Sequence, residues 1–375
     1  MVRVLVIQQL YNLSDEQMEF QLLDRLSFQR FMGLRQSSQA PDRTTIWTFR
    51  ERLIKAGAAE RIFEAMNRQL DRHGYIARGG QMIDASIVPV PKQTLRRDEK
   101  EIVQQDAMPV QWSPSKRRQK DVQARWTKKH GKSYFGYKLS SSVDRRHKLI
   151  RRVLVSTASE NDTLHFEGVL DCGNTSRDVY ADKGYVDRER EQRLRAQGWR
   201  LHIERKGHAG KPISDCQQRR NRRIAKTRAR VEHVFASLEQ LGGKVLRSIG
   251  LARAALHLNW KAATYNLRRL YILMEVEPAA FWRPKWAWGG QKRPDPGGDG
   301  ENTAPPTCEQ VANRSARAIV TISSGHKTGN SRCPMGAICP DFIKTSGKVE
   351  FVANLLWRGI LQRSFGRGTR VRDGG

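Results

Sequence analysis

Residues 82–88 read Met-Ile-Asp-Ala-Ser-Ile-Val, and this stretch decides the fold. Its apolar and β-branched residues predict a buried strand, which Pro89 and Pro91 end because proline lacks the N–H that a central strand needs. Asp84 lies in the middle of the stretch, where a charge without a partner would cost several kcal/mol. Such a carboxylate is expected to bind a metal ion or to lie at an open end of the sheet.

A second apolar strand, at 178–182, ends at Asp182 beside the turn residue Gly184. Between the two strands, the runs 135–143 and 149–156 flank a polar turn and predict a hairpin. Further patterns predict a helix at 164–170, a helix at 188–196, a strand at 200–204 and an amphipathic helix at 221–241. This order predicts the α/β class, with a mixed sheet that is flanked by helices.

Three carboxylates are candidates for one catalytic site. Asp84 and Asp182 would emerge together where neighbouring strands end, and Glu232 lies at the edge of the apolar stripe of the last helix. Phosphodiester chemistry with two magnesium ions about 3.5–4 Å apart needs several carboxylates from separate elements. We therefore predict that these three acids are catalytic residues and metal ligands. Each alone has another interpretation, as a turn or cap residue or as part of a surface ion pair.

The charge of the chain indicates a nucleic acid as its partner. Its 375 residues include 68 Lys and Arg against 38 Asp and Glu, which gives a net charge of +30 and a pI near 10.5. Such an excess is typical of proteins that neutralise phosphates, although a solvated basic surface is the alternative. The basic residues for which we predict DNA contacts are Lys128, Lys129, Lys132, Lys138, Lys183, Arg222, Arg223 and Arg228.

The chain divides into three expected regions. Near its start, Phe20, Leu23 and Leu26 have helical spacing and predict helices that bind DNA, form a dimer or serve structure alone. The sequence after the last amphipathic helix is rich in Trp, Pro and Gly and has no sustained periodicity. The expected regions are a helical subdomain at 1–75, a catalytic domain at 79–275 with a basic insertion at 92–132, and an irregular or disordered extension at 279–375.

These residues resemble the DDE transposases of bacterial insertion sequences, in particular the IS-five branch, whose catalytic domain is RNase H-like. The most specific similarity is the pair of motifs Asp182-Lys183-Gly184-Tyr185 and Arg230-Val231-Glu232-His233, in this order. The resemblance spans roughly residues 8–275. Other similar stretches are 13–31, 83–86, 121–126 and 136–138.

The resemblance implies a DNA transposase that cleaves at the ends of its element and transfers the cut strand into target DNA. It implies two Mg²⁺ ions, replaceable by Mn²⁺, on Asp84, Asp182 and Glu232. The implied partners are double-stranded DNA, with terminal inverted repeats and a target site, and further copies in a homo-oligomer. Arg228 stands four residues before Glu232, where related transposases place a basic residue for DNA. Their accompanying Tyr and Lys are replaced by Ala225 and Glu239.

Two other hypotheses stay open. The chain begins almost at the similar region and continues for about a hundred residues after it, which motivates a catalytically inactive DNA-binding remnant that occupies element ends. A structure-specific nuclease on the same fold is the third hypothesis. The sequence has neither a secretory cleavage site nor an apolar stretch of membrane length, so we expect a cytoplasmic protein at the bacterial nucleoid, without membrane association.

Overall fold

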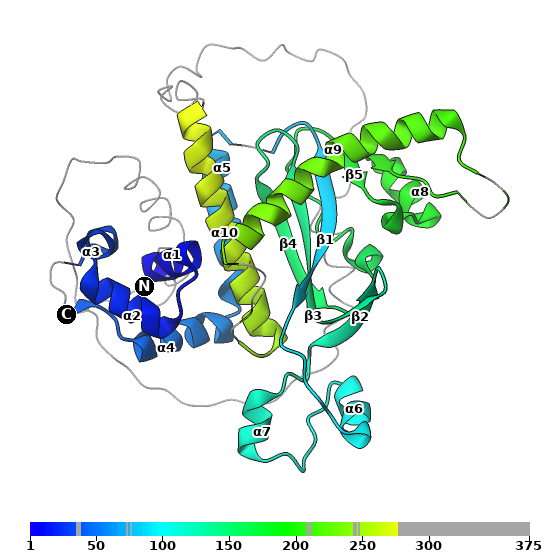
Figure 1. Cartoon of the computed structure of the whole chain (residues 1–375). Coiled ribbons are helices and arrows are strands. Elements are labelled where there is room, and N and C mark those ends of the chain that lie inside the picture. The colour runs from blue at the N-terminus through cyan, green and yellow to red at the C-terminus, as the bar shows by residue number, and fades with distance from the viewer. Residues whose placement is uncertain are drawn as a thin grey trace, which may run out of the picture. The chain divides into compact units, whose positions relative to one another are not determined.

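A computed structural model shows a mixed sheet with helices packed against it (Figure 1). The structure describes residues 1–34, 39–72, 74–75, 77–207, 210, 212–242, 246 and 248–276. The extension expected at 279–375 therefore lies outside the described residues. Within the described ranges, no helix is both long and apolar enough to cross a membrane.

The sheet has six strands, in the order β2-β3-β1-β5-β6, with β4 paired to β3. Strand β1 is antiparallel to β3 and parallel to β5, and β5 is parallel to β6. The strand bounds are Gln81–Pro89 (β1), Arg125–Lys129 (β2), Lys132–Asp144 (β3), Ile150–Thr157 (β4), Asp178–Ala181 (β5) and Arg200–Ile203 (β6). The α/β class, the mixed sheet and the β3–β4 hairpin are confirmed, and the arrangement is consistent with an RNase H-like domain.

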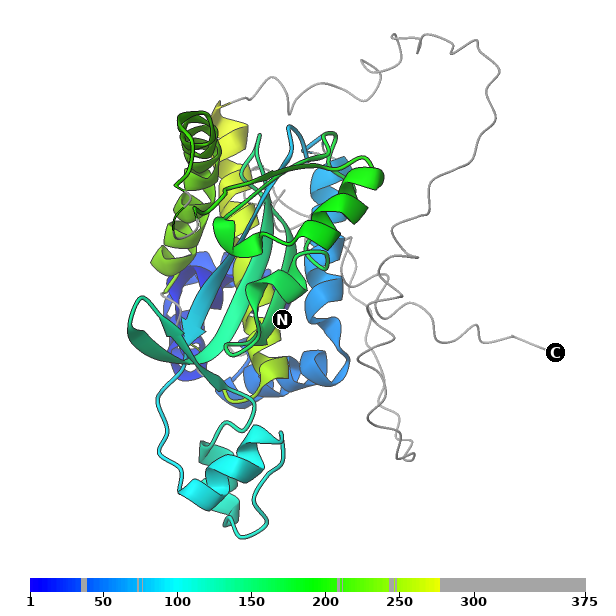
Figure 2. The ribbon, with the colours of Figure 1, turned by 90° about the vertical axis from the view of Figure 1, so that its right-hand side faces the viewer.

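Two long helices, α9 (Asp215–Gln240) and α10 (Leu251–Val276), pack against the face of the sheet that includes Met82 (Figure 2). Ser214 begins α9 by accepting a hydrogen bond from a backbone N–H of its first turn. Val231 of α9 lies in the same core as Met82. Because alternate residues of a strand share a face, Asp84 points to the same side of the sheet as Met82.

The opposite face of the sheet carries shorter elements. Ile83 packs there in a core with side chains from α8 (Arg188–Ala196) and from the neighbourhood of the 3-10 helices η2 (Asp162–His165) and η3 (Lys183–Tyr185). The α-helix expected at 164–170 is not formed; η2 and a series of turns take its place. A glycine within that stretch disfavours a continuous helix.

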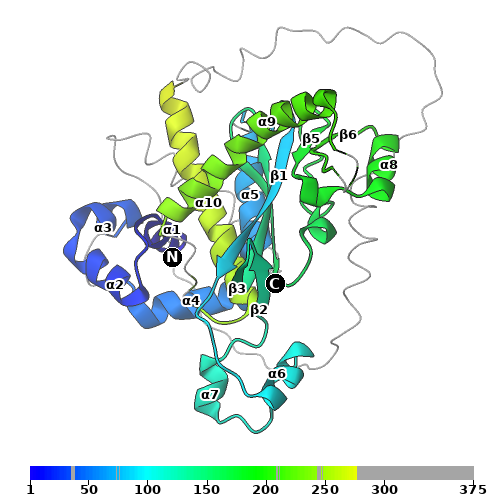
Figure 3. The ribbon, with the colours of Figure 1, turned by 45° about the vertical axis from the view of Figure 1, so that its right-hand side comes forward.

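The first part of the chain is helical, as expected, and it shares its hydrophobic core with α10 and the sheet. Figure 3 shows α1, α2 and α3 grouped on the side of α10 away from β5 and α8. The bounds of these helices are Val2–Tyr11 (α1), Asp15–Asp24 (α2), Leu26–Met32 (α3), Arg43–Lys55 (α4) and Ala58–Arg72 (α5).

The apolar positions of α2 are used differently from what their spacing suggested. Phe20, Leu23 and Leu26 are 63%, 52% and 67% exposed, whereas Met18 and Leu22 are fully buried. Met18 and Leu22 lie four residues apart and therefore on one face of the helix. Leu26 is not on this helix at all, because α2 ends at Asp24. The buried stripe is thus a different face of the same helix.

The basic insertion at 92–132 contains ordered elements. Helices α6 (Arg97–Gln104) and α7 (Pro114–Gln119) extend below the sheet in Figure 1. Glu99 joins them, since its carboxylate accepts a hydrogen bond from the Trp112 indole at 2.8 Å and forms an ion pair with Lys116. The last part of the insertion is β2, which belongs to the sheet and pairs with β3.

Candidate active site

The register of the three parallel strands places carboxylates in a row. Met82 of β1 pairs with Tyr180 of β5, which in turn pairs with His202 of β6. Residues two positions further along each strand share the same face, and neighbouring strands lie about 4.8 Å apart. We call the three carboxylates at these positions the acidic row: Asp84, Asp182 and Glu204.

Arg228 of α9 connects the three carboxylates of the acidic row. Its Nη2 lies 3.4 Å from Asp84 Oδ2, and its Nη1 lies 3.7 Å from Asp182 Oδ1 and 3.1 Å from Glu204 Oε1. The arginine side chain is only 12% exposed, so these contacts are made largely away from solvent. One guanidinium therefore stands where three negative charges meet.

The surroundings raise the pKa of both Asp84 and Arg228, which disfavours the charge of the acid and favours the charge of the base. Burial raises the pKa of Asp84, although Arg228 and the N–H of Ala85 lower it in part. Burial alone would lower the pKa of Arg228, but Asp84 and Asp182 outweigh that effect and raise it. The site therefore favours the charged form of Arg228 and disfavours the charged form of Asp84.

Glu232, the third predicted acid, is not in contact with the other two. It is exposed on α9, one turn after Arg228, and next to the buried Val231. The helix starts over β6, where Arg220 bonds to the carbonyl of Ile203, and continues towards β1. Glu232 therefore lies beyond Arg228 in the direction of β1, which carries Asp84.

The carboxylate pair of Asp84 and Asp182 suits a cation, because a guanidinium already lies against both. Among the described residues, no group of three or more His, Cys, Asp or Glu side chains is arranged to hold a metal ion. The structure thus brings two of the three predicted metal ligands together and leaves Glu232 outside the pair. Its role as a ligand stays a prediction.

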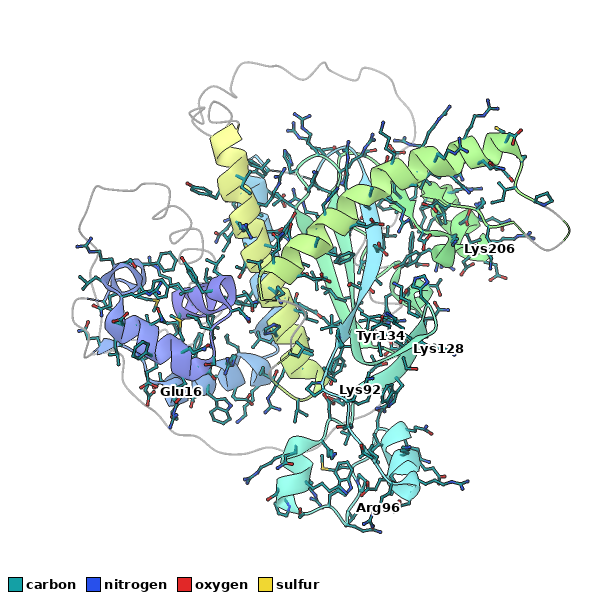
Figure 4. All side chains as sticks on the ribbon, in the orientation of Figure 1. Glu16, Lys92, Arg96, Lys128, Tyr134 and Lys206 are labelled. Atoms are coloured by element: carbon teal, nitrogen blue, oxygen red, sulfur yellow. The ribbon has the colours of Figure 1, made fainter. Side chains whose placement is uncertain are left out.

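A cavity of about 190 Å³ lies between β1, from Ala85 to Ile87, and the β2–β3 hairpin. In Figure 4 the labelled residues Lys128, on β2, and Tyr134, on β3, locate this hairpin. The positive charge of Lys129 acts on Asp84 and offsets part of the rise in pKa that burial causes. We call this cavity the lysine pocket; its lining consists of Ala85, Ser86, Ile87, Thr127, Lys128, Lys129, Lys138 and Asp162.

The three lysines of the pocket differ in what they bind. Lys138 is 12% exposed, and its Nζ lies 2.9 Å from Asp162 Oδ1 and 2.5 Å from the carbonyl of Glu160. Lys128 and Lys129 are exposed and form no ion pair within the described part of the chain. Two of the lysines therefore have ammonium groups available for an anion, and the third is held by the protein itself.

A glycine brings the hairpin close to β1. Gly136 of β3 lies opposite Pro89, and a Cβ at this position would come within 2.2 Å of the Val88 carbonyl oxygen. No side chain fits there. The hairpin that carries Lys128 and Lys129 can approach β1 because this residue has no side chain.

The remaining predicted DNA contacts are distributed over the surface. Lys183 follows Asp182 directly and is exposed, and Lys132 is exposed at the start of β3. Arg222 and Arg223 are exposed on the first half of α9. None of these four side chains forms an ion pair in the described ranges; Lys183 contacts the acidic row only through its backbone N–H, which donates to Asp182 Oδ1 at 2.7 Å. Their role in DNA binding stays a prediction.

Tyr185, which follows Asp182 in the motif, is buried. It is 3% exposed, and its phenol oxygen has no hydrogen-bond partner among the described residues. Burial and the nearby charge of Asp84 raise its pKa. Arg190 holds the turn by donating to the carbonyls of Tyr185 and Thr163. The tyrosine therefore packs beneath the site and does not present its hydroxyl at the surface.

Glu204 is the site residue that the sequence pattern did not single out. It follows β6 as Asp182 follows β5, and its backbone N–H bonds to the carbonyl of Ala181 at 3.3 Å. The available signal was the expected strand at 200–204, which ends on an acid. The strand pattern by itself does not place Glu204 near Asp182; the parallel pairing of β5 with β6 does.

Comparison with known proteins adds two matches. A family model described as "Transposase DDE domain" matches residues 77–267. A second, described as "Transposase domain (DUF772)", matches residues 1–52. No solved structure matches the chain.

Proposed function

Since this chain belongs to the transposases with a DDE domain, we propose that it cleaves phosphodiester bonds at the ends of a mobile DNA element and joins the 3′ ends to target DNA. The observation that carries the proposal is the convergence of Asp84 and Asp182 on one cationic group, Arg228. Asp182 directly follows the end of β5, and Asp84 lies within β1, two residues beyond its last parallel pair with β5. Ligand sites of α/β sheets lie at such strand ends.

The proposed cofactor is magnesium, in two ions, with manganese as a substitute. Asp84 and Asp182 would hold it with hard carboxylate oxygens, and Glu232 would add a ligand from α9. When bound, the metal would polarise the phosphoryl oxygen and activate the attacking water or 3′-hydroxyl. The protein contributes the fixed sheet register and a largely buried Asp84, whose pKa is raised by burial; a bound cation would offset the cost of that buried charge.

The proposed substrate is double-stranded DNA, with terminal inverted repeats and a target site. The lysine pocket supports this substrate, because Lys128 and Lys129 line it with no ion-pair partner among the described residues, and the charge of Lys129 acts on Asp84. Phosphate contacts of this kind position a DNA backbone and do not read its sequence. Membership of the IS-five branch and action as a homo-oligomer on paired ends belong to the same proposal, supported by the motifs around Asp182 and Glu232.

The test is a cleavage assay with the purified full chain, Mg²⁺ or Mn²⁺, and labelled DNA that carries the element's own ends. We expect metal-dependent cleavage that exposes a 3′-hydroxyl and then its transfer to a second DNA. Asp182→Asn and Glu232→Gln should each lower the rate at least about a thousandfold, the scale of an essential electrostatic group.

Glu239→Gln is the matched control, because it makes the same chemical change on α9 about two turns after Glu232. It should retain activity. Cleavage that survives in Asp182→Asn contradicts the proposed site, and cleavage without strand transfer indicates a nuclease. DNA binding without cleavage in the wild type identifies an inactive remnant instead.

A further inference from the structure

Arg228 occupies the place where a metal ion would bind. Its guanidinium contacts Asp84 at 3.4 Å and Asp182 at 3.7 Å, the two carboxylates that the proposed function assigns to magnesium. A unit positive charge at this distance repels a divalent cation, the more so because the arginine is largely buried and weakly screened. Metal and guanidinium therefore compete for the same pair of carboxylates.

Glu204 offers the guanidinium another position. Its contact with Arg228, at 3.1 Å, is the shortest of the three ion pairs. The strand order β1-β5-β6 puts Glu204 on the side of Asp182 that faces away from Asp84. A rotation of the arginine about its outer bonds can keep the contact with Glu204 while it releases Asp84.

We propose that Arg228 is an internal competitor for the metal site, and that Glu204 is a positioning residue that retains Arg228 when a divalent cation binds to Asp84 and Asp182. The inference rests on the proposed function, because it presumes that these two aspartates bind metal. In this arrangement Arg228 is the countercharge of the acidic row before the divalent cation binds. The same arginine stays beside the reacting DNA afterwards.

Two features of the surroundings fit this role. Glu204 is 17% exposed, and a hydrogen bond from its backbone N–H to the Ala181 carbonyl holds its main chain in place beside β5. The Nε of Arg228 is buried without a hydrogen-bond partner in the described part of the chain. The guanidinium is thus held only through its two Nη atoms, and no contact at Nε has to break when it turns.

The test measures Mn²⁺ binding to the full chain without DNA, from the loss of the free-ion signal in electron paramagnetic resonance. Arg228→Gln removes the competing charge and should tighten Mn²⁺ binding about tenfold. Glu204→Gln keeps the shape but removes the charge that holds the arginine aside, and should weaken binding about three- to fivefold. Arg228→Lys, which keeps the charge on a group that cannot bridge the row, serves as a second variant if Arg228→Gln unfolds; it should tighten binding less.

The double variant Arg228→Gln/Glu204→Gln separates a positioning role from a direct one. If Glu204 acts through Arg228, its substitution should change Mn²⁺ affinity by less than about twofold once the arginine is gone. A loss of affinity as large as in the single variant means that Glu204 is itself a ligand and overturns the inference. Weaker binding by Arg228→Gln also overturns it. Absence of Mn²⁺ binding in the wild type and in Arg228→Gln contradicts the metal-dependent function on which the inference rests.

Discussion

The acidic row extends from β1 towards β6, and the lysine pocket lies between β1 and the β2–β3 hairpin; the two regions differ in how their charges are paired. In the row, three carboxylates surround one arginine, and every charged group has an opposite charge within 4 Å. In the pocket, Lys138 is paired with Asp162, whereas Lys128 and Lys129 have no ion-pair partner among the described residues. In the acidic row the protein supplies a countercharge for every charged group, whereas in the lysine pocket two ammonium groups have no countercharge among the described residues.

The difference indicates which kind of ion the acidic row and the lysine pocket can each bind. An excess of carboxylates around a single cation leaves net negative charge for a further or stronger cation. Two exposed ammonium groups leave positive charge for an anion such as a phosphodiester.

The largest effect should come from the lysine pocket. The double variant Lys128→Ala/Lys129→Ala should weaken binding to DNA by roughly tenfold to hundredfold at low salt, because each lysine releases counterions from a phosphate. The slope of log K against log salt should fall by about 2. Fluorescence anisotropy at several salt concentrations measures both quantities. An unchanged slope would mean that the pocket does not meet the backbone.

Lys138 should behave differently from its two neighbours in the pocket. Because its ammonium is already bound to Asp162 and the Glu160 carbonyl, Lys138→Met should leave the salt slope unchanged. It should instead lower the free energy of unfolding by about 1 kcal/mol, as loss of a partly buried charged hydrogen bond does. Urea unfolding followed by circular dichroism measures this. A reduced salt slope in Lys138→Met would erase the distinction between held and free lysines.

The smallest expected effect is the change in Tm on neutralising Asp84 in the acidic row. The pKa of Asp84 is raised in the folded protein, so folding disfavours its charged form and that charge costs stability near pH 7. Asp84→Asn should therefore raise Tm by roughly 1–3 °C without metal at pH 7.5. The gain should shrink as the pH falls towards about 4, where the wild-type carboxyl also becomes neutral.

Differential scanning calorimetry at pH 7.5 and 4.5 checks this prediction. Asp182→Asn is a useful comparison in the same scans, because that side chain is 39% exposed, whereas Asp84 is 20% exposed. A lower Tm for Asp84→Asn at pH 7.5 would show that Arg228 stabilises the charged carboxylate more than burial opposes it.

Much of the catalytic domain followed from local patterns. The apolar strands around Asp84 and before Asp182 and the β3–β4 hairpin are all formed, because their side chains alternate or are buried on both faces. Phe135, Tyr137 and Leu139 are buried, as expected for alternate residues of the predicted strand at 135–143.

Other expectations failed where the outcome depended on neighbours. The apolar residues of α2 had two available faces, and the surrounding helices selected Met18 and Leu22 over Phe20 and Leu23. The strand β2 lay within a polar, basic segment, and only the hydrogen bonds of the β3 edge make it a strand. Neither choice is encoded in the residues of the element itself.

The sequence alone determined the fold class, the basic character of the chain, and two aspartates in or directly after apolar strands as candidates for metal chemistry. These depend on hydrophobic periodicity, on net charge and on the cost of burying a charge, which are properties of short segments. Only the tertiary structure decided that Glu204 and Arg228 belong with those aspartates, and that Glu232 stands apart from the pair. The physical reason is that the register between strands and the position of α9 arise from packing between segments far apart in the chain, and no single segment contains that information.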